Sequence, residues 1–405
     1  MKTFFLNSLI FLFLANCIPA QWEKSITPYS GNINELKCIG NNIYAATQEG
    51  GVLQFNGNGT SWQQINSGLN NLSIRSIAQL NSGFFACTLG GIYLSEDGGN
   101  FWQNSSVGLN SSNISSIVEV DNLIFAGAWA DGIYKSTNGG KNWTKLSNNP
   151  SSLLIEKLAT NNNILYACTW GGGIYKSTDD GVNWSFISNT ISDLFINTIA
   201  INNNILYVGT WSYGVFISSD GGITWKKSNE GLTSSSVFDF EFIGNNIIIG
   251  TSGGVFLSTN GGNNWSNING GGINHLTTIF SVKIYGNYLV AGGTQETGIW
   301  RRPLSDVITD IDEDYKPFFN FNLCQNYPNP FNPVTTIDFS IPYSGFVTLK
   351  IYDVLGKEIA TLVNMYLQAG TYSKIWDASK YKSGIYFYKL IANEITKTKK
   401  MLLVK

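Results

Sequence analysis

The sequence of 405 residues predicts an all-β fold: a seven-bladed β-propeller closed by its N-terminal strand, then a small antiparallel β-sandwich of immunoglobulin-like type. Three observations predict this. Glycine is abundant (43 residues), aromatic residues make up 14% of the chain and charged residues only 13%, which is typical of short strands joined by tight turns. The phrase STNGGKNW at 136–143 recurs in close copies. Beyond residue 303 the repeats stop and a different run of alternating strands begins.

Two series of residues define the repeat. One consists of tryptophans spaced 40 or 41 residues apart: Trp22, Trp62, Trp102, Trp143, Trp184, Trp225 and Trp265. The other consists of glycines followed by a β-branched residue: Gly51, Gly91, Gly132, Gly173, Gly214, Gly254 and Gly298. The two series are out of phase, because the first tryptophan precedes every glycine and the last glycine has no tryptophan after it. A period of this length is typical of a propeller.

Each repeat contains four predicted strands. In the fifth repeat they are 196–201, 205–210, 214–218 and 224–228, separated by turn-forming NNN, WSY and SDGG sequences. The phase difference predicts that residues 22–25 supply the outer strand of the last blade. The propeller is therefore expected to span 21–303, and its closure removes two exposed sheet edges.

The repeated phrase lies between the third and the outer strand of each blade. An Asp or Asn at its third position can accept backbone hydrogen bonds, its glycines allow positive φ, and its tryptophan can fold back over the turn. The phrase resembles the Asp-box, or bacterial neuraminidase repeat, of sialidases, xyloglucanases and photosystem II assembly factor-like propellers. This resemblance implies a structural turn away from the active face. Two copies have Asn where the family has Asp, and 56–62 is a degenerate copy. The turn residues are Asp97, Asn138, Asp179, Asp220 and Asn260, with Trp102, Trp143, Trp184, Trp225 and Trp265.

The opposite face is the predicted ligand-binding face. Trp129, Trp170 and Trp211 occupy equivalent positions in three consecutive blades, and such an arc suits stacking against sugar rings or a protein partner. The alternative is that these indoles pack between blades and cover glycine-rich loops. At the same end, the innermost strands contribute seven equivalent residues: Asn34, Arg75, Ser115, Glu156, Asn197, Phe238 and Phe280.

A second hypothesis is a polysaccharide-active glycoside hydrolase of sialidase or xyloglucanase type. Glycosidases use two carboxylates roughly 5–10 Å apart, and Glu35, Glu156 and Asp239 are the candidates; the alternative role for them is in channel salt bridges or a solvated rim. Sialidase chemistry implies an arginine triad, whereas Arg75, Arg301 and Arg302 do not follow that family's motif. Xyloglucanases of this repeat type use two propellers, and one is predicted here. We therefore expect a binding or structural module.

The composition excludes several classes of cofactor and partner. The single histidine argues against a multi-histidine metal centre, and no cofactor is expected. A net charge of −2 gives no reason to expect nucleic acid as a partner. The apolar run 4–14 indicates a signal peptide over 1–20 rather than a membrane span, and no other segment could cross a bilayer. The four later cysteines are expected to be free.

An acidic linker at 304–320 precedes the C-terminal region 321–405. This region is similar, in order and spacing, to the type A C-terminal sorting domain of the type IX secretion system. The similarity rests on QNYPNPFNP, IYDVLGKEI, SGIYFYKL and the terminal KKMLLVK. It implies a Gram-negative bacterium of the Bacteroidota or a close relative, and partners in the secretion machinery and a surface sortase. The protein is thus expected to be secreted, or displayed on the outer membrane. The sorting motif consists of Asn326, Tyr327, Pro328, Asn329, Pro330, Phe331, Asn332 and Pro333.

Overall fold

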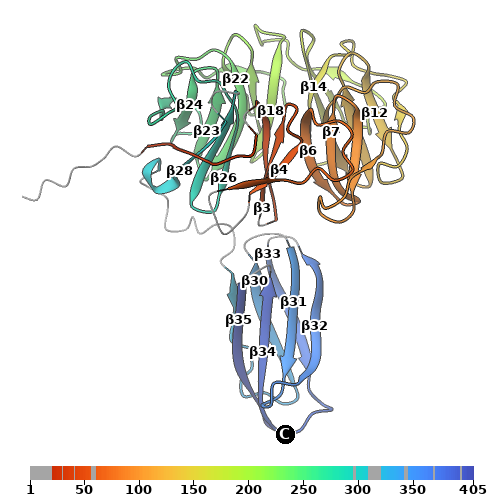
Figure 1. The fold of residues 1–405 in the computed structure, drawn as a ribbon, viewed down its shortest axis with the longest axis vertical. Helices are drawn as coiled ribbons and strands as arrows, with labels where there is room; N and C mark the ends of the chain where they lie inside the picture. The colour runs from red at the N-terminus through yellow and green to blue at the C-terminus, as the bar shows by residue number, and fades with distance from the viewer. Residues whose placement is uncertain are drawn as a thin grey trace, which may run out of the picture.

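The computed structural model describes residues 21–29, 31–40, 42–55, 61–294, 298–308, 321–341, 345–367, 370–392 and 395–405. The predicted signal peptide lies outside this range, as does most of the predicted linker. The described chain forms a propeller and a C-terminal sandwich, and Figure 1 shows both as all-β bodies.

Seven four-stranded antiparallel sheets form the blades of the propeller, as predicted. Their innermost strands contact one another around a closed ring: β2 (Ile33–Ile39), β6 (Ile74–Leu80), β10 (Ile114–Val120), β14 (Ile155–Asn161), β18 (Ile196–Asn202), β22 (Val237–Ile243) and β26 (Ile279–Tyr285). The second strands are β3 (Asn42–Thr47), β7 (Gly83–Thr88), β11 (Leu123–Ala128), β15 (Ile164–Thr169), β19 (Ile205–Thr210), β23 (Asn246–Thr251) and β27 (Tyr288–Gly293).

The third strands are β4 (Val52–Phe55), β8 (Gly91–Ser95), β12 (Gly132–Ser136), β16 (Gly173–Ser177), β20 (Val215–Ser218), β24 (Gly254–Ser258) and β28 (Ile299–Pro303). The outer strands are short: β5 (Trp62–Gln64), β9 (Gln103–Asn104), β13 (Thr144–Lys145), β17 (Ser185–Phe186), β21 (Lys226–Lys227), β25 (Ser266–Asn267) and β1 (Glu23–Lys24). Among the described residues, a separate cluster of buried side chains, rich in Ile, Val, Leu, Phe and Tyr, lies between each pair of adjacent blades, so the core is divided into seven parts around the ring.

The N-terminal strand closes the ring, which confirms the prediction from the phase difference. Strand β1 pairs with β28, with Glu23 opposite Arg301 and Lys24 opposite Trp300. Trp22 is buried and its Nε1 donates to the Ile268 carbonyl of the sixth blade at 3.0 Å. The chain after β28 continues into a short 3-10 turn, η1 (Leu304–Asp306). Leu304 and Ile308 are buried in the same core cluster as Trp22, so residues 304–308 pack onto the propeller.

The repeated phrase forms the turn between the third and outer strands. In the third blade, the Ser136 hydroxyl donates to Asn138 Oδ1 at 3.0 Å, and the Asn142 amide donates to the same oxygen at 3.0 Å. In the second blade, Asp97 Oδ1 accepts the matching bonds from Ser95 (2.7 Å) and Phe101 (2.9 Å). Asn and Asp are interchangeable here because only an acceptor oxygen is required.

The tryptophan of each phrase also joins two blades. Trp143 Nε1 donates to the carbonyl of Ser105 in the preceding blade at 2.8 Å, and Trp102, Trp225 and Trp265 make the equivalent bond. The indole is thus both a cover over its own turn and a link to the preceding blade. Trp184 and Trp62 are exceptions: the buried Nε1 of each has no partner among the described residues.

Each innermost strand contains a one-residue β-bulge near its start. The pairing register shifts between Ile33 and Glu35, for example, and at the equivalent point of the other six blades. A bulge leaves one residue without a pairing partner and re-aims its side chain. The seven bulged residues are Asn34, Arg75, Ser115, Glu156, Asn197, Phe238 and Phe280, the set that the repeat alignment brought together.

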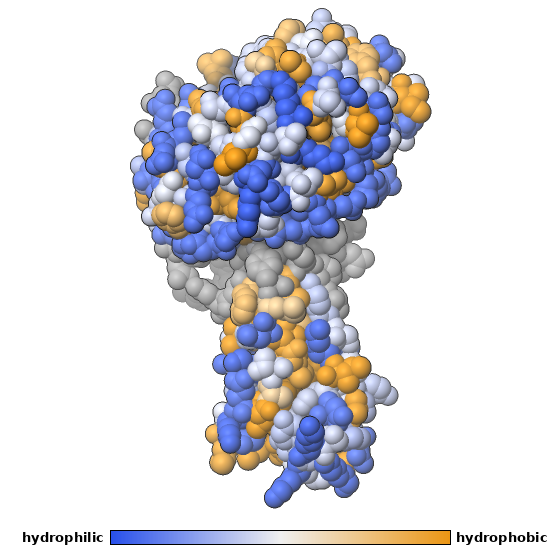
Figure 2. Space-filling model, turned by 90° about the vertical axis from the view of Figure 1, so that its right-hand side faces the viewer, coloured by the Kyte–Doolittle hydropathy of each residue, from blue (hydrophilic) through white to orange (hydrophobic). Residues whose placement is uncertain are grey.

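The C-terminal region is a two-sheet antiparallel sandwich with its own core, which includes Leu349, Trp376 and Tyr388. Its strands are β29 (Asn322–Leu323), β30 (Val334–Ile341), β31 (Gly345–Tyr352), β32 (Glu358–Leu367), β33 (Gly370–Asp377), β34 (Gly384–Ala392) and β35 (Ile395–Leu403). On the face seen in Figure 2, apolar side chains run along much of this region, whereas the propeller surface is mostly hydrophilic.

The predicted sorting motif is built into this sandwich rather than extended from it. Asn326 is buried, and its Nδ2 donates to the Pro328 carbonyl (3.0 Å) and the Thr335 hydroxyl (2.9 Å). The Asn326 amide donates to the Tyr388 hydroxyl at 2.9 Å. The motif is thereby tied to β30 and β34.

Candidate ligand-binding site

A cavity of about 360 Å³ lies at the mouth of the central channel, at the end opposite the repeated turns. All seven bulged residues line it, so every blade contributes to its wall. We call it the channel-mouth cavity. Its size falls within the usual range for small-molecule sites.

Aromatic side chains form one side of the cavity. The three predicted tryptophans are structurally equivalent, because each backbone amide donates to the carbonyl just before the innermost strand of its own blade: Trp129 to Asn113 (2.9 Å), Trp170 to Leu154 (2.9 Å) and Trp211 to Phe195 (3.0 Å). Trp170 and Trp211 line the cavity, and Trp211 exposes 46% of its surface. Trp129 is not among the lining residues; it is half-buried and its ring contacts that of Trp170.

The arc is longer than the sequence suggested. The rings of Trp170 and Trp211 lie 5.1 Å apart, edge to face. Trp211 contacts Phe238 at 6.0 Å, and Phe238 contacts Phe280 at 5.1 Å. Phe195, which sequence reasoning did not single out, packs against Trp170 at 5.2 Å. Sequence analysis had grouped Phe238 and Phe280 among the equivalent innermost-strand residues. It could not predict that the loop tryptophan of one blade contacts the bulged residue of the next.

Polar side chains form the other side. Arg75 Nη2 contacts both carboxylate oxygens of Glu156, at 3.2 and 3.0 Å, across the intervening blade. The guanidinium also lies 5.6 Å from the centre of the Trp129 ring, in a cation–π arrangement. Burial raises the pKa of Glu156, and the Arg75 charge opposes this only in part.

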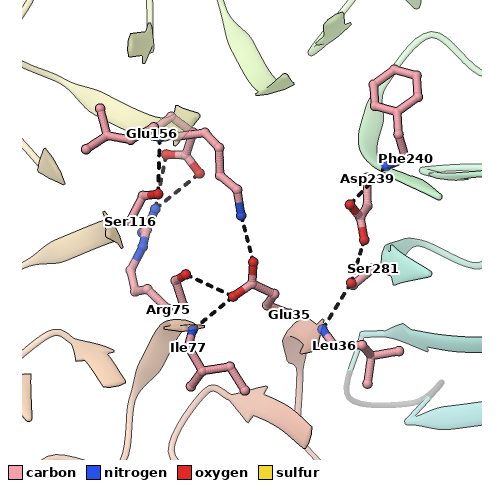
Figure 3. Close-up of polar contacts among 12 residues, drawn as sticks. Glu35, Leu36, Arg75, Ile77, Ser116, Glu156, Asp239, Phe240 and Ser281 are labelled. Carbon is pink, nitrogen blue, oxygen red and sulfur yellow. Dashed lines mark hydrogen bonds and ion pairs between the residues drawn. The ribbon is translucent and has the colours of Figure 1, made fainter. Parts of the chain in front are cut away.

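Glu35 occupies the floor of the cavity. It accepts hydrogen bonds from Lys157 Nζ (2.7 Å), the Ser76 hydroxyl (2.9 Å) and the Ile77 amide (2.9 Å). Burial favours the neutral acid, but the charges of Lys157 and Lys37 and these hydrogen bonds outweigh it, and the pKa of Glu35 falls to about 2. Figure 3 shows Glu35, Glu156 and Asp239 at separate places around the channel, each held by its own contacts.

Asp239, the third predicted carboxylate, is not among the cavity-lining residues. It accepts hydrogen bonds from the Ser281 hydroxyl (2.6 Å), the Val282 amide (3.1 Å) and Lys283 Nζ (2.9 Å). Ser281 in turn accepts the Leu36 amide at 3.0 Å, as Figure 3 shows. These contacts satisfy backbone donors on the inner edge of the next blade and hold neighbouring blades together.

Three bulged residues also bond across blade boundaries, but as donors. Asn34 Nδ2 donates to the Ile74 carbonyl (2.7 Å), Asn197 Nδ2 to the Val237 carbonyl (3.1 Å), and the Ser115 hydroxyl to the Ile155 carbonyl (2.6 Å). The two amide side chains are thereby oriented with Oδ1 as the remaining acceptor. Within the described ranges, no group of His, Cys, Asp and Glu could hold a metal ion, and the four described cysteines are free.

Comparisons with known proteins found matches to the C-terminal region and to the propeller fold. Residues 325–405 match the secretion system C-terminal sorting domain. No curated protein matches the chain. YCF48 bound to D1 peptide is similar in structure, with 16% identity and a TM-score of 0.55 over 70% of this chain and 96% of that one.

Two further solved structures are similar. One is the GH74 xyloglucanase from Xanthomonas campestris, with 13% identity and a TM-score of 0.56 over 87% of this chain; the match spans 63% of the xyloglucanase. The other is the WD40 β-propeller domain of Doa1, with 13% identity and a TM-score of 0.53 over 70% of this chain and 96% of that one. At these identities the likeness establishes the propeller fold alone.

The sorting tail establishes where the protein goes. Among the residues that the structure describes, no helix is long and apolar enough to cross a membrane. The protein is therefore an all-β propeller whose tail, a type IX secretion system sorting domain, directs it to the cell surface or the extracellular space.

Proposed function

We propose that the exported propeller is a carbohydrate-binding module and that the channel-mouth cavity is its binding site. The observation that carries this is the aromatic arc from Trp170 through Trp211 to Phe238 and Phe280, facing amide and hydroxyl side chains in one cavity. Aromatic rings stack against the apolar faces of sugars, and amides and hydroxyls bind the sugar hydroxyls.

The state of the carboxylates supports binding over hydrolysis. A glycosidase needs a protonated acid and a second carboxylate that acts on water or on the sugar. Glu35 has a pKa of about 2 and is occupied by three donors, and Asp239 is outside the cavity lining. Glu156 has a raised pKa, but Arg75 holds both of its oxygens.

Two finer assignments belong to the same proposal. The repeated turns are Asp-box turns, supported by the acceptor role of Asp97 and Asn138 described above. The source organism belongs to the Bacteroidota or a close relative, supported by the type of sorting tail.

The test is glycan binding by the full-length exported protein, with a glycan array followed by isothermal titration. Trp211→Ala removes an exposed stacking surface and should weaken binding at least tenfold, about 1.4 kcal/mol. Phe101→Ala is the matched control, because this aromatic is similarly exposed (51%) but lies in a turn at the opposite end of the propeller. Equal loss in both variants, no glycan binding at all, or binding of peptides alone contradicts the proposal.

A further inference from the structure

We infer that the channel-mouth cavity takes the end of an uncharged glycan chain rather than an internal segment or an acidic glycan. This inference rests on the proposed function and narrows it to a class of ligand. Two features carry it: the cavity lies within the ring of seven blades with an ion pair across its floor, and its charged side chains are already paired.

The floor of the cavity is closed by an ion pair that spans the ring. Lys157 Nζ on the fourth blade reaches Glu35 Oε1 on the first blade at 2.7 Å. Further down the channel, Lys283 contacts Asp239 at 2.9 Å and Glu241 at 3.1 Å. These ion pairs lie across the channel below the cavity, so we expect them to block the passage of a polymer.

The bulged residues of all seven blades line the cavity, so it is surrounded by the ring of innermost strands. A chain bound along its length needs a cleft open at two sides, so that it can enter and leave. A cavity with one opening admits a chain end, whose terminal ring then reaches Trp211 and the acceptor oxygens of Asn34 and Asn197.

The charges of the lining exclude an ionic ligand. The cavity contains two acidic and two basic side chains, and they form the pairs Arg75–Glu156 (3.0 Å) and Lys157–Glu35 (2.7 Å). A carboxylate or ammonium group on the ligand competes with one of these pairs and leaves a partly buried charge without its partner, which is unfavourable. The hydroxyl groups of a neutral sugar can bind without breaking either ion pair.

The experiment is a length series in isothermal titration on the full-length protein. The probes are cello-, manno- and xylo-oligosaccharides from dimer to hexamer, a long soluble polymer of each, and oligogalacturonides of matching length. We expect one protein per glycan chain at every length, and at least tenfold weaker binding of the oligogalacturonides. Stoichiometry that rises with chain length, or oligogalacturonides that bind as tightly, overturns the inference.

This design separates the two claims. If binding depends on Trp211 but the number of proteins bound per glycan rises with chain length, the inference is wrong and the proposed function stands. Binding of the oligogalacturonides alone also removes only the inference, whereas failure of every probe, neutral and acidic, removes both.

A charge variant tests the pairing argument independently. Glu156→Gln frees the Arg75 guanidinium, so oligogalacturonide binding should strengthen at least tenfold relative to the neutral probe. The control is Glu96→Gln, the same change at an exposed position in a turn at the opposite end of the propeller. It should change neither oligogalacturonide binding nor binding of the neutral probe. If the Glu156→Gln protein melts like wild type but keeps the same preference for neutral over acidic oligosaccharides, the pairing argument is contradicted.

Discussion

The tryptophans of the repeated turns offer a matched pair for testing how the blades are joined. Trp143 is 3% exposed and its Nε1 donates to the Ser105 carbonyl at 2.8 Å. Trp184 stands at the same position of the next blade, but its buried Nε1 has no partner among the described residues. The equivalent carbonyl, that of Leu146, accepts Asn149 Nδ2 at 2.8 Å instead.

The substitution of Phe for each tryptophan isolates the contribution of the indole N–H. Both variants lose the pyrrole part of the ring, but only Trp143→Phe leaves a buried carbonyl without its donor. Such a loss costs about 1–3 kcal/mol. Trp184→Phe removes an unsatisfied donor and should be close to neutral. Trp143→Phe is thus expected to lower the unfolding free energy by about 2 kcal/mol more than Trp184→Phe.

Urea unfolding of the full-length protein, followed by tryptophan fluorescence, measures this difference, since all tryptophans except Trp376 lie in the propeller. The slope of free energy against urea should be unchanged, so the shift in midpoint reports stability directly. Equal losses in the two variants would refute the inter-blade role of the indole. A larger loss for Trp184→Phe would refute it as well.

Three further predictions concern the channel, the catalytic alternative and the tail. The pKa of Glu35 in the folded protein, about 2, lies below its ordinary value of 4.5, so its stabilising contribution is present above pH 4.5 and is lost as pH falls towards 2. Glu35→Gln should be roughly 3 kcal/mol less stable than wild type at pH 7, and urea unfolding should show the gap closing near pH 2; a gap independent of pH contradicts this. Reducing-sugar release from polysaccharides should be no higher for wild type than for Glu156→Gln or Asp239→Asn, and turnover that disappears in these variants would restore the hydrolase hypothesis. Deletion of 321–405 should hold the protein in the periplasm, as cell fractionation would show; normal surface delivery of the truncated chain would speak against the assigned role of the tail.

Much of the fold was predictable because the sequence repeat has a fixed period. The out-of-phase tryptophan and glycine series predicted both the seven blades and the pairing of β1 with β28. The same alignment grouped the seven innermost-strand residues that line the cavity, although it did not reveal the bulge that turns them towards it.

The interactions within the site were less accessible to sequence reasoning. Lys157 and Glu35 are 122 residues apart, and their contact depends on which blades face each other across the channel and on the reach of a lysine side chain. The extension of the aromatic arc to Phe195 and Phe238 likewise depends on how the loop of one blade meets the bulge of the next. A repeat period predicts equivalent positions but says nothing of contacts between positions that are not equivalent.

The position of a bound glycan is the most direct test of the account. A crystal structure of the protein with an oligosaccharide selected by the array should show a terminal sugar ring against Trp211, inside the channel-mouth cavity, with hydroxyl groups near Asn34 and Asn197. An oligosaccharide bound in the repeated turns, in the grooves between blades or on the C-terminal sandwich, with the cavity empty, would contradict it.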